Sequence, residues 1–526
     1  MKEKKLTVLD STLRDGAQGE GISFSVRDKL AVAEALDELG VAYIEAGNPA
    51  SNPKDEEFFK AAAGLRLSNA RLCAFGSTRR RSVRAEEDAG LKALLSANTP
   101  VVVVFGKSWD FHATEILKVS LEENLDMIYD TVKYLKACGK EVIFDAEHFF
   151  DGYKRNPGYA VRTLRAAESA GADSVCLCDT NGGCFPDEVG EIVGGARAAV
   201  GIPVGVHMHD DSGMAVANSV IGAIAGAAQV QGTLVGFGER CGNANLSTVI
   251  ADLQLKRGYS CIPEEKTELL TTICRRVAEI ANVRLARNMP YVGKSAFAHK
   301  AGMHIDGVNK ASSSFEHISP ASVGNSRRFL MSEVAGRSTV LERLQKIDPT
   351  VTKNDPVAAK TVAMIKDMEY LGYQFEGAEA SFELLLRKAL GTYTPYFTLE
   401  KFKTIGEQIS GERYSPATAV VKVNVDGVSE ISAAEGNGPV NALDVALRKA
   451  LERFYPTLKE VALTDYKVRI LDGRDTTSAK TRVLIESGDG RDIWTTVGVS
   501  RDIIEASFTA LRDAIEYKLI KDGKKP

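Results

Sequence analysis

The stretch DSVCLCDTNGGCFPDEVGEIVGGARAAVGIPVGVHMHDD (173–211) decides the fold of this chain of 526 residues. It begins with a short apolar run, continues through a stretch of helical composition, and ends in a second apolar run. A strand–helix–strand unit of this length pairs its two strands in parallel through a right-handed crossover. Polar side chains follow each apolar run directly, which places them where parallel strands end.

The same unit recurs from the N-terminus to about residue 255. Eight apolar, β-branched runs start about 25–40 residues apart, with an amphipathic stretch between most neighbours. The runs are LTVLDSTL (6–13), VAYIEAG (41–47), ARLCAFGST (70–78), PVVVVFG (100–106), EVIFDAEHF (141–149), DSVCLCDTNG (173–182), IPVGVHMHDD (202–211) and QVQGTLVGFGER (229–240). Eight such units favour a closed (β/α)8 TIM barrel over residues 1–265. The alternative is an open doubly wound sheet, which is disfavoured because no G-x-G-x-x-G or Walker motif follows any run.

Residues 266–415 are predicted to form helical linker or lid subdomains. A helix is expected at 267–283, and further helices at 331–346 and 357–392, the last broken at GYQFEGAEAS. The Gly/Ser-rich segment between them (293–326) has the length and composition of a lid or active-site loop.

Residues 416–526 change character, because their apolar residues alternate with polar ones around Asp-Gly turns. The stretches ALRKALERF (446–454) and ALRDAIEYK (510–518) form a weak internal repeat, each preceded by strand-and-turn sequence. Two β-rich hairpins, each followed by a helix, would make a small α+β domain. Since it carries no ionisable cluster, we expect a binding or oligomerisation module.

The composition of the chain excludes several classes of binding partner. Lys and Arg total 66 and Asp and Glu total 70, for a net charge of −4, which argues against nucleic acid or an anionic membrane as the main partner. No apolar stretch is long enough for a membrane span, and the basic N-terminus lacks the apolar core of a signal peptide. The eight scattered cysteines are typical of reduced thiols. We therefore expect a cytoplasmic protein that acts on small molecules.

His207 and His209 form the sharpest local signal. In a strand, residues i and i+2 face the same side, so this H-x-H pattern puts two imidazoles on one face. Asp15, Asp210, Asp211 and Asn243 follow other strands or the same one. Mixed nitrogen and oxygen ligands favour a divalent metal, namely Mg, Mn or Zn with open positions. The alternative is a pair of hydrogen-bonded core histidines.

Two further strand ends carry groups suited to chemistry. Arg14, beside Asp15, can hold a carboxylate or stabilise an enolate oxygen, and the alternative is a salt bridge with Glu45. Glu147 shares a face with Asp145, so one of them can have a raised pKa and act as a base. The alternative for Glu147 is a structural carboxylate paired with Arg14 or a lysine.

Other candidates are weaker. Cys176 and Cys178 are interpreted as packing residues of a buried strand and not as a second metal site, and Cys184 is not expected to be catalytic. His304 and Asp306, in the Gly/Ser-rich segment, can complete the site if that segment closes over it. An exposed loop histidine is an equally good interpretation from local sequence.

Three motifs together are highly specific: LDSTLRDGAQGEG (9–21), VHMHDD (206–211) and GFGERCGNANL (236–246). They resemble the metal-dependent Claisen-condensing barrels, which are the isopropylmalate, homocitrate and citramalate synthases, with hydroxymethylglutaryl-CoA lyase more distant. The resemblance runs nearly end to end. AFAHKAGMHIDGVNK (296–310) looks like the family's helical subdomain, and GPVNALDVAL (438–447) like its C-terminal regulatory domain, which the lyase lacks.

Within this family, three segments resemble the long-form citramalate synthases more than the isopropylmalate synthases: FGSTRR (75–80), DAEHFFDGYK (145–154) and GYQFEGAEASFELL (372–385). The resemblance implies an acyltransferase that condenses acetyl-CoA with pyruvate and hydrolyses the thioester to (R)-citramalate and CoA, for isoleucine biosynthesis. It also implies a homodimer and an isoleucine effector on the C-terminal domain.

The resemblance also assigns roles, residue by residue. It implies metal ligands at Asp15, His207, His209 and Asn243. It implies 2-oxoacid binding by Arg14 and Thr180, and catalytic roles for Arg14, Glu147, His304 and Asp306. It places the acyl-CoA beside Gly236, Gly238, Glu239, Arg240 and Gly242. One position departs, because Phe315 stands where the family often has a tyrosine, and the choice of base between Glu147 and His304 stays open.

Three other functions stay open from sequence. The nearest is isopropylmalate synthase, with the same chemistry on 2-oxoisovalerate, and pocket size distinguishes the two. A carbon–carbon lyase is disfavoured by the C-terminal domain. The least favoured is a non-enzymatic amino-acid sensor with a silent barrel, which predicts that His207→Ala leaves every measurable function intact.

Overall fold

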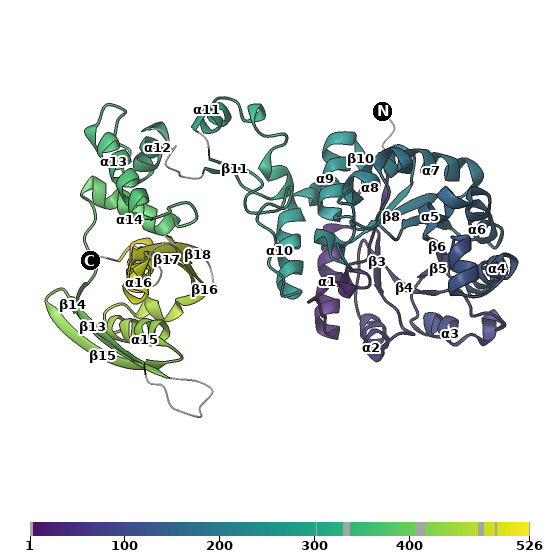
Figure 1. The fold of residues 1–526 in the computed structure, drawn as a ribbon, viewed down its shortest axis with the longest axis horizontal. Helices are drawn as coiled ribbons and strands as arrows, with labels where there is room; N and C mark the ends of the chain where they lie inside the picture. The colour runs from purple at the N-terminus through teal and green to yellow at the C-terminus, as the bar shows by residue number, and fades with distance from the viewer. Residues whose placement is uncertain are drawn as a thin grey trace. The chain divides into compact units, whose positions relative to one another are not determined.

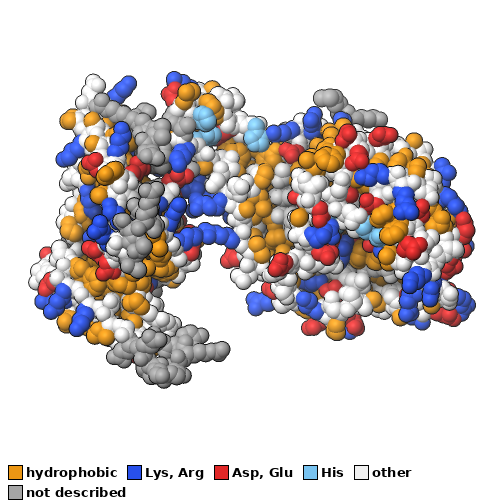
Figure 2. All heavy atoms as spheres, viewed as in Figure 1, with side chains coloured by type: hydrophobic (Ala, Val, Ile, Leu, Met, Phe, Trp, Pro, Cys, Tyr) orange, Lys and Arg blue, Asp and Glu red, His pale blue; other side chains and the backbone are white. Residues whose placement is uncertain are grey.

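The computed structural model describes residues 4–300, 302–329, 337–406, 416–471, 478–489 and 492–524. The chain divides into two compact units, one made of residues 1–297 and 316–327 and the other of 298–315 and 328–526 (Figure 1). Basic and acidic side chains are interspersed over the visible face of each unit, in keeping with the near-balanced charge (Figure 2). Among the described residues, no helix combines the length and apolar character needed to cross a membrane.

The first unit is a closed barrel in which all eight strands run parallel. Its strands are β2 (Thr7–Asp10), β3 (Tyr43–Gly47), β4 (Arg71–Ser77), β5 (Val101–Lys107), β6 (Glu141–Glu147), β7 (Ser174–Asp179), β8 (Val204–Met208) and β9 (Gln229–Gly232). A two-residue parallel pair, β1 (Lys4–Lys5) with β10 (Tyr259–Ser260), lies outside the barrel order. The predicted (β/α)8 barrel is confirmed and the open sheet is wrong.

Helices follow the strands around the barrel (Figure 1). They are α1 (Val26–Leu39), α2 (Pro53–Ala62), α3 (Ala89–Ser96), α4 (Leu121–Ala137), α5 (Phe149–Arg155), α6 (Pro157–Ser169), α7 (Pro186–Ala199), α8 (Ala215–Ile224), α9 (Leu246–Arg257) and α10 (Leu270–Ile280). Local sequence fixes their ends. Ser25 and Asp28 form a reciprocal capping box at the start of α1, and Gly40 ends it with a left-handed φ of 93°.

The barrel interior changes from apolar to polar along the strands. Leu9, Cys73, Val103 and Ile143 form a buried apolar cluster inside it. Two residues further along β6, the inward position is Asp145, which is buried. Buried polar groups need partners, so the carboxyl ends of these strands are organised by hydrogen bonds and not by packing alone.

The second unit begins with a helical part. Its elements are β11 (Ala298–His299) paired with β12 (Arg328–Phe329), α11 (Gly302–Lys310), α12 (Arg337–Ile347), α13 (Pro356–Leu371) and α14 (Glu379–Leu390). The predicted break at GYQFEGAEAS is confirmed between α13 and α14. The expectation of a loop over 293–326 is wrong where α11 lies. Ile305 and Val308 are both 3% exposed and share one helical face, a pattern that Gly302 and Gly307 within this short helix obscure.

The α+β part of this unit contains two three-stranded antiparallel sheets, each followed by a helix. The first has β13 (Thr398–Gly406), β14 (Ala417–Val425), β15 (Val428–Gly436) and α15 (Pro439–Leu451). The second has β16 (Ala462–Ile470), β17 (Thr481–Gly488), β18 (Ile493–Ser500) and α16 (Ile503–Lys521). The predicted α+β class is confirmed, with one more strand per sheet than a hairpin. The boundaries at 265 and 415 stay predictions, and residue 415 lies outside the described residues.

Candidate metal centre and active site

Three predicted metal ligands meet at the carboxyl ends of β2 and β8. Asp15 Oδ2 lies 3.2 Å from Nε2 of His207 and 3.8 Å from Nε2 of His209, and the two Nε2 atoms are 3.3 Å apart. All three residues are buried. A carboxylate and two imidazoles facing one point match the ligand set of a divalent cation.

Gln231 on β9 fixes the orientation of His207. Its Nε2 donates to Asp145 Oδ1 at 2.9 Å, so its Oε1 faces Nδ1 of His207, 3.1 Å away. Because a carbonyl oxygen only accepts, Nδ1 carries a proton, and Nε2 is the ring nitrogen that faces Asp15 and would bind a metal. Burial also lowers the pKa of His209 to about 4, so this ring is neutral, as a ligand must be.

Asn243 supplies the fourth candidate ligand. Its backbone bridges to His209, its Nδ2 donates to Phe237 O at 3.2 Å, and its Oδ1 is buried without a hydrogen-bond partner among the described residues. An unpartnered buried amide oxygen is costly unless a ligand satisfies it. Together with Asp15, His207 and His209, this oxygen fits a divalent cation that prefers mixed nitrogen and oxygen donors.

Arg14 lies beside the cluster. Its Nε donates to Glu45 Oε2 at 2.6 Å, its Nη1 lies 3.4 Å from Asp15 Oδ1, and its guanidinium packs 3.8 Å from the centre of the Phe75 ring. Burial raises the pKa of Asp15, but Arg14 and His207 outweigh it and lower that pKa below its usual range. The predicted salt bridge to Glu45 is present, and the cation also sits next to the candidate metal ligands.

Glu147 and Thr180 lie at the neighbouring strand ends of β6 and β7. Glu147 forms an ion pair with Lys107 at the end of β5. The sequence left a pairing of Glu147 with a lysine open, and this ion pair is present in the structure. Thr180 Oγ1 accepts a hydrogen bond from the His148 backbone N–H at 3.0 Å. The raised pKa expected for one carboxyl of the Asp145/Glu147 pair belongs to Asp145, where burial and then Glu45 raise it to about 7.

The glycine-rich loop after β9 is tied to this edge of the barrel. Arg240 donates to Asp211 Oδ1 at 2.7 Å and to Thr180 O at 2.8 Å. A side chain on Gly242 would place its Cβ 2.1 Å from Gly236 O, and one on Gly238 would place it 2.2 Å from Asn243 Nδ2. These glycines therefore let the loop pack against Asn243. The acyl-CoA role of Gly236, Gly238, Glu239, Arg240 and Gly242 stays a prediction.

His304 and Asp306 belong to the second unit. On α11, the His304 ring stacks on Phe315 with centroids 4.3 Å apart, and Asp306 pairs with Lys310 at 2.6 Å. Both side chains are exposed in that unit. Their part in the barrel's chemistry stays a prediction.

Asp145, Cys176 and Cys178 form a second cluster with the spacing of metal ligands inside the barrel. Burial raises the pKa of the Cys176 thiol well above its usual value, and Asp145 adds to the shift. A protonated buried thiol is a poor metal ligand, which supports the packing interpretation. All eight cysteines are free.

Sequence reasoning missed two residues of this site. Gln231 was part of a predicted strand but was given no role, although β8–β9 pairing places it directly opposite His207. Lys107 ends β5 directly opposite Glu147 on β6. In both cases the signal was a polar residue at the inward end of an apolar strand.

Comparison with known proteins identifies the architecture. An HMGL-like family model matches residues 5–279, a homocitrate synthase post-HMGL domain-like model residues 291–370, and a LeuA allosteric (dimerisation) domain model residues 376–519. The (R)-citramalate synthase of Aquifex aeolicus is 52% identical over 99% of this chain and 98% of its own length. The chain belongs to the (R)-citramalate synthase family.

Two further relatives show how sequence identity differs between the groups of this family. The (R)-citramalate synthase of Geobacter sulfurreducens is 51% identical over 97% of each chain. A probable 2-isopropylmalate synthase of Methanopyrus kandleri is 34% identical over 96% of this chain and 97% of its own. The chain thus shares one architecture with both groups and is more similar in sequence to these two citramalate synthases.

Proposed function

We propose that this chain is an acyltransferase that condenses acetyl-CoA with pyruvate and releases (R)-citramalate and CoA. The observation that carries the proposal is full-length similarity, because five (R)-citramalate synthases are 46–52% identical over at least 97% of this chain. Isopropylmalate synthase is the second candidate, supported by matches at 31–34% identity.

Asp15, His207, His209 and Asn243 are the residues that would hold a divalent cation, with Mg, Mn and Zn as candidates. When bound, such a cation supplies Lewis acidity for the keto group of the acceptor. The support is their shared burial, the short distances among three of them, and the unpartnered Oδ1 of Asn243.

Arg14 would bind and stabilise negative charge on the acceptor. Its Nε is committed to Glu45 and its guanidinium is held flat against Phe75, so the cation is fixed before substrate arrives. Because this cation is already in place, little free energy is spent on rearranging the site when negative charge develops on the keto oxygen. The Thr180 hydroxyl, whose oxygen accepts from His148, keeps its own proton to donate to the acceptor's carboxylate.

Carbon–carbon bond formation needs a base for the acetyl methyl group. Glu147 and His304 are the candidates, and Glu147 is held by Lys107 at the strand ends. The methyl carbon, once deprotonated, attacks the keto carbon, and the resulting alkoxide takes up a proton. Water then hydrolyses the thioester, so acetyl-CoA, pyruvate and water become citramalate and CoA.

The direct test is product identification. The full chain, incubated with acetyl-CoA, pyruvate and Mg²⁺ or Mn²⁺, is expected to release one CoA per citramalate, and chiral chromatography is expected to give the R enantiomer. Failure to form citramalate, or cleavage of hydroxymethylglutaryl-CoA instead, would contradict the proposal.

Three finer features belong to the same proposal. The LeuA-type match over 376–519 supports a homodimer, and the resemblance supports isoleucine as an effector of residues 416–526. The eight free cysteines support a cytoplasmic location.

A further inference from the structure

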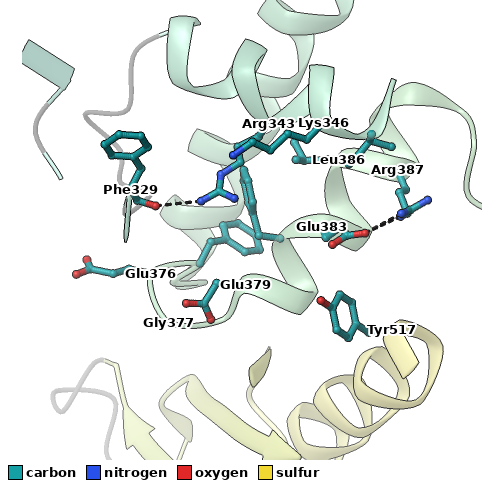
Figure 3. Close-up of a pocket in the computed structure, with 13 residues that line it drawn as sticks. Phe329, Arg343, Lys346, Glu376, Gly377, Glu379, Glu383, Leu386, Arg387 and Tyr517 are labelled. Atoms are coloured by element: carbon teal, nitrogen blue, oxygen red, sulfur yellow. Dashed lines mark hydrogen bonds and ion pairs between the residues drawn. The ribbon is translucent and has the colours of Figure 1, made fainter. Parts of the chain in front are cut away.

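A pocket of about 280 Å³ lies in the second unit, among α12, α14, the turn that precedes α14, and α16 (Figure 3). It is separate from the metal-binding cluster, whose residues all belong to the first unit. Its volume is near the lower end of the range of small-molecule sites, roughly 300–1,000 Å³.

Hydrocarbon forms one wall of this pocket. Phe375, Phe382 and Leu386 line it, and they are 4%, 5% and 2% exposed. The two rings lie 5.6 Å apart at an angle of 57°, and both belong to the buried core of the helical part. The wall is therefore rigid, and an apolar group placed on it would lose its contact with water.

The acidic residues around the pocket are already neutralised. Three glutamates line it, and each has a basic partner: the pairs are Glu376 with Lys300, Glu379 with Arg328, and Glu383 with Arg387. None of these pairs uses Arg343 or Lys346, the two other cations of the lining. The lining thus holds three acidic and three basic side chains, but the glutamates pair in a way that leaves Arg343 and Lys346 outside these pairs.

Arg343 is the better oriented of these two cations. Its Nη2 donates to Phe329 O at 3.2 Å, which orients the guanidinium, and it has no carboxylate partner among the described residues. Figure 3 shows the Arg343 guanidinium directed toward the backbone oxygen of Phe329, with a dashed line between them. Lys346 lies one turn further along α12, and its ion-pair partner among the described residues is the partly exposed Glu342, at 3.4 Å. An oriented guanidinium with unused N–H groups favours a carboxylate.

We propose that this pocket binds a small carboxylate with a branched or aromatic hydrocarbon body. The carboxylate pairs with Arg343 and the hydrocarbon lies on Phe375 and Phe382. Because Tyr517 of α16 also lines the pocket, the ligand contacts both the helical part and the α+β part of this unit. Binding here is independent of the proposed condensation.

The test is isothermal titration calorimetry on the full chain in the presence of EDTA, so that no divalent metal competes for the ligand. The probes are benzoate and 3-methylbutanoate, with benzamide and 3-methylbutanamide as uncharged controls of the same shape. At least one acid is expected to bind saturably, with a Kd of about 1 mM or lower and at least tenfold tighter than its amide.

Variants locate the binding. Arg343→Gln is expected to weaken it at least tenfold, whereas Arg453→Gln, at an exposed arginine outside the pocket, leaves it unchanged. Ile347→Glu keeps Arg343 and supplies a competing carboxylate from the pocket lining, so it also weakens binding. The comparison uses variants that retain the wild-type circular dichroism spectrum. No saturable binding, equal affinity of acid and amide, or equal affinity of Arg343→Gln, Ile347→Glu and Arg453→Gln overturns the proposal.

Discussion

At the scale of single residues, Gln231 connects the candidate metal ligands to the barrel interior. It receives the Nδ1–H of His207 and donates to Asp145, so it fixes which imidazole nitrogen faces Asp15. Outer partners of this kind orient ligating histidines and raise their affinity for metal.

Gln231→Leu is therefore expected to weaken divalent-metal binding about 10–100-fold. Gln229→Leu is the matched control, because it removes a buried glutamine of the same strand that accepts a second hydrogen bond from Gln231 Nε2, at 3.2 Å, while the hydrogen bond between Gln231 and His207 is not part of the change. Metal titration by calorimetry measures both. Equal affinities for the two variants would show that Gln231 does not orient His207.

Asp15→Ala and His207→Ala remove proposed metal ligands from a site that is otherwise held by the barrel. Each is expected to lower kcat with pyruvate at least about 100-fold, since the keto group loses its Lewis acid. Circular dichroism is expected to stay that of the wild type. Wild-type turnover in either variant would show that the reaction does not need a metal held by these residues.

The sequence predicted the ligand cluster because H-x-H needs only the two-residue repeat of a strand to bring His207 and His209 together. It could not predict the hydrogen bond of Gln231, or that Lys107 is the lysine that pairs with Glu147. Those depend on which strands are neighbours and on their register, and closure of the barrel determines both.

At the scale of elements, Asp37 connects α1 to the chain that leads into β4. Its carboxylate accepts hydrogen bonds from the backbone N–H groups of Ser68, Asn69 and Ala70 at 2.7–3.0 Å. Burial opposes the charge, but these donors outweigh it and lower the pKa of Asp37. A carboxyl with a lowered pKa stabilises the fold above its unfolded pKa, and the contribution is lost as pH falls through the folded value.

Asp37→Asn is thus expected to lower the free energy of unfolding by about 1–3 kcal/mol at pH 7. The difference from the wild type is expected to shrink as pH falls below about 4, the unfolded pKa of aspartate. Urea unfolding followed at several pH values measures this. A difference that stays constant down to pH 3 would mean that the charge of Asp37 contributes nothing.

Elements were predicted where their periodicity was unbroken, as in the barrel strands and in α13 and α14. β13 was not predicted, because its TLEKFKTIG sequence leaves most residues exposed at a sheet edge and so lacks a strongly apolar face. α11 was not predicted, because Gly302 and Gly307 within it lower helix propensity, while tertiary packing of Ile305 and Val308 stabilises it.

At the scale of the whole molecule, the catalytic barrel and the LeuA-type region occupy different compact units. Isoleucine is expected to slow CoA release by the full chain and to protect β14, β17, α15 and α16 from hydrogen exchange. Leucine at the same concentration is the control. Inhibition without protection in those elements, or no inhibition at all, would contradict an effector site there.

Steady-state CoA release measures whether pyruvate is the acceptor of the acetyl group. The full chain is assayed with acetyl-CoA, a divalent metal, and either pyruvate or 2-oxoisovalerate. The kcat/KM for pyruvate is expected to be about 100-fold or more above that for 2-oxoisovalerate, because a site shaped for a methyl group must exclude an isopropyl group. Equal values, or a preference for 2-oxoisovalerate, would contradict this expectation.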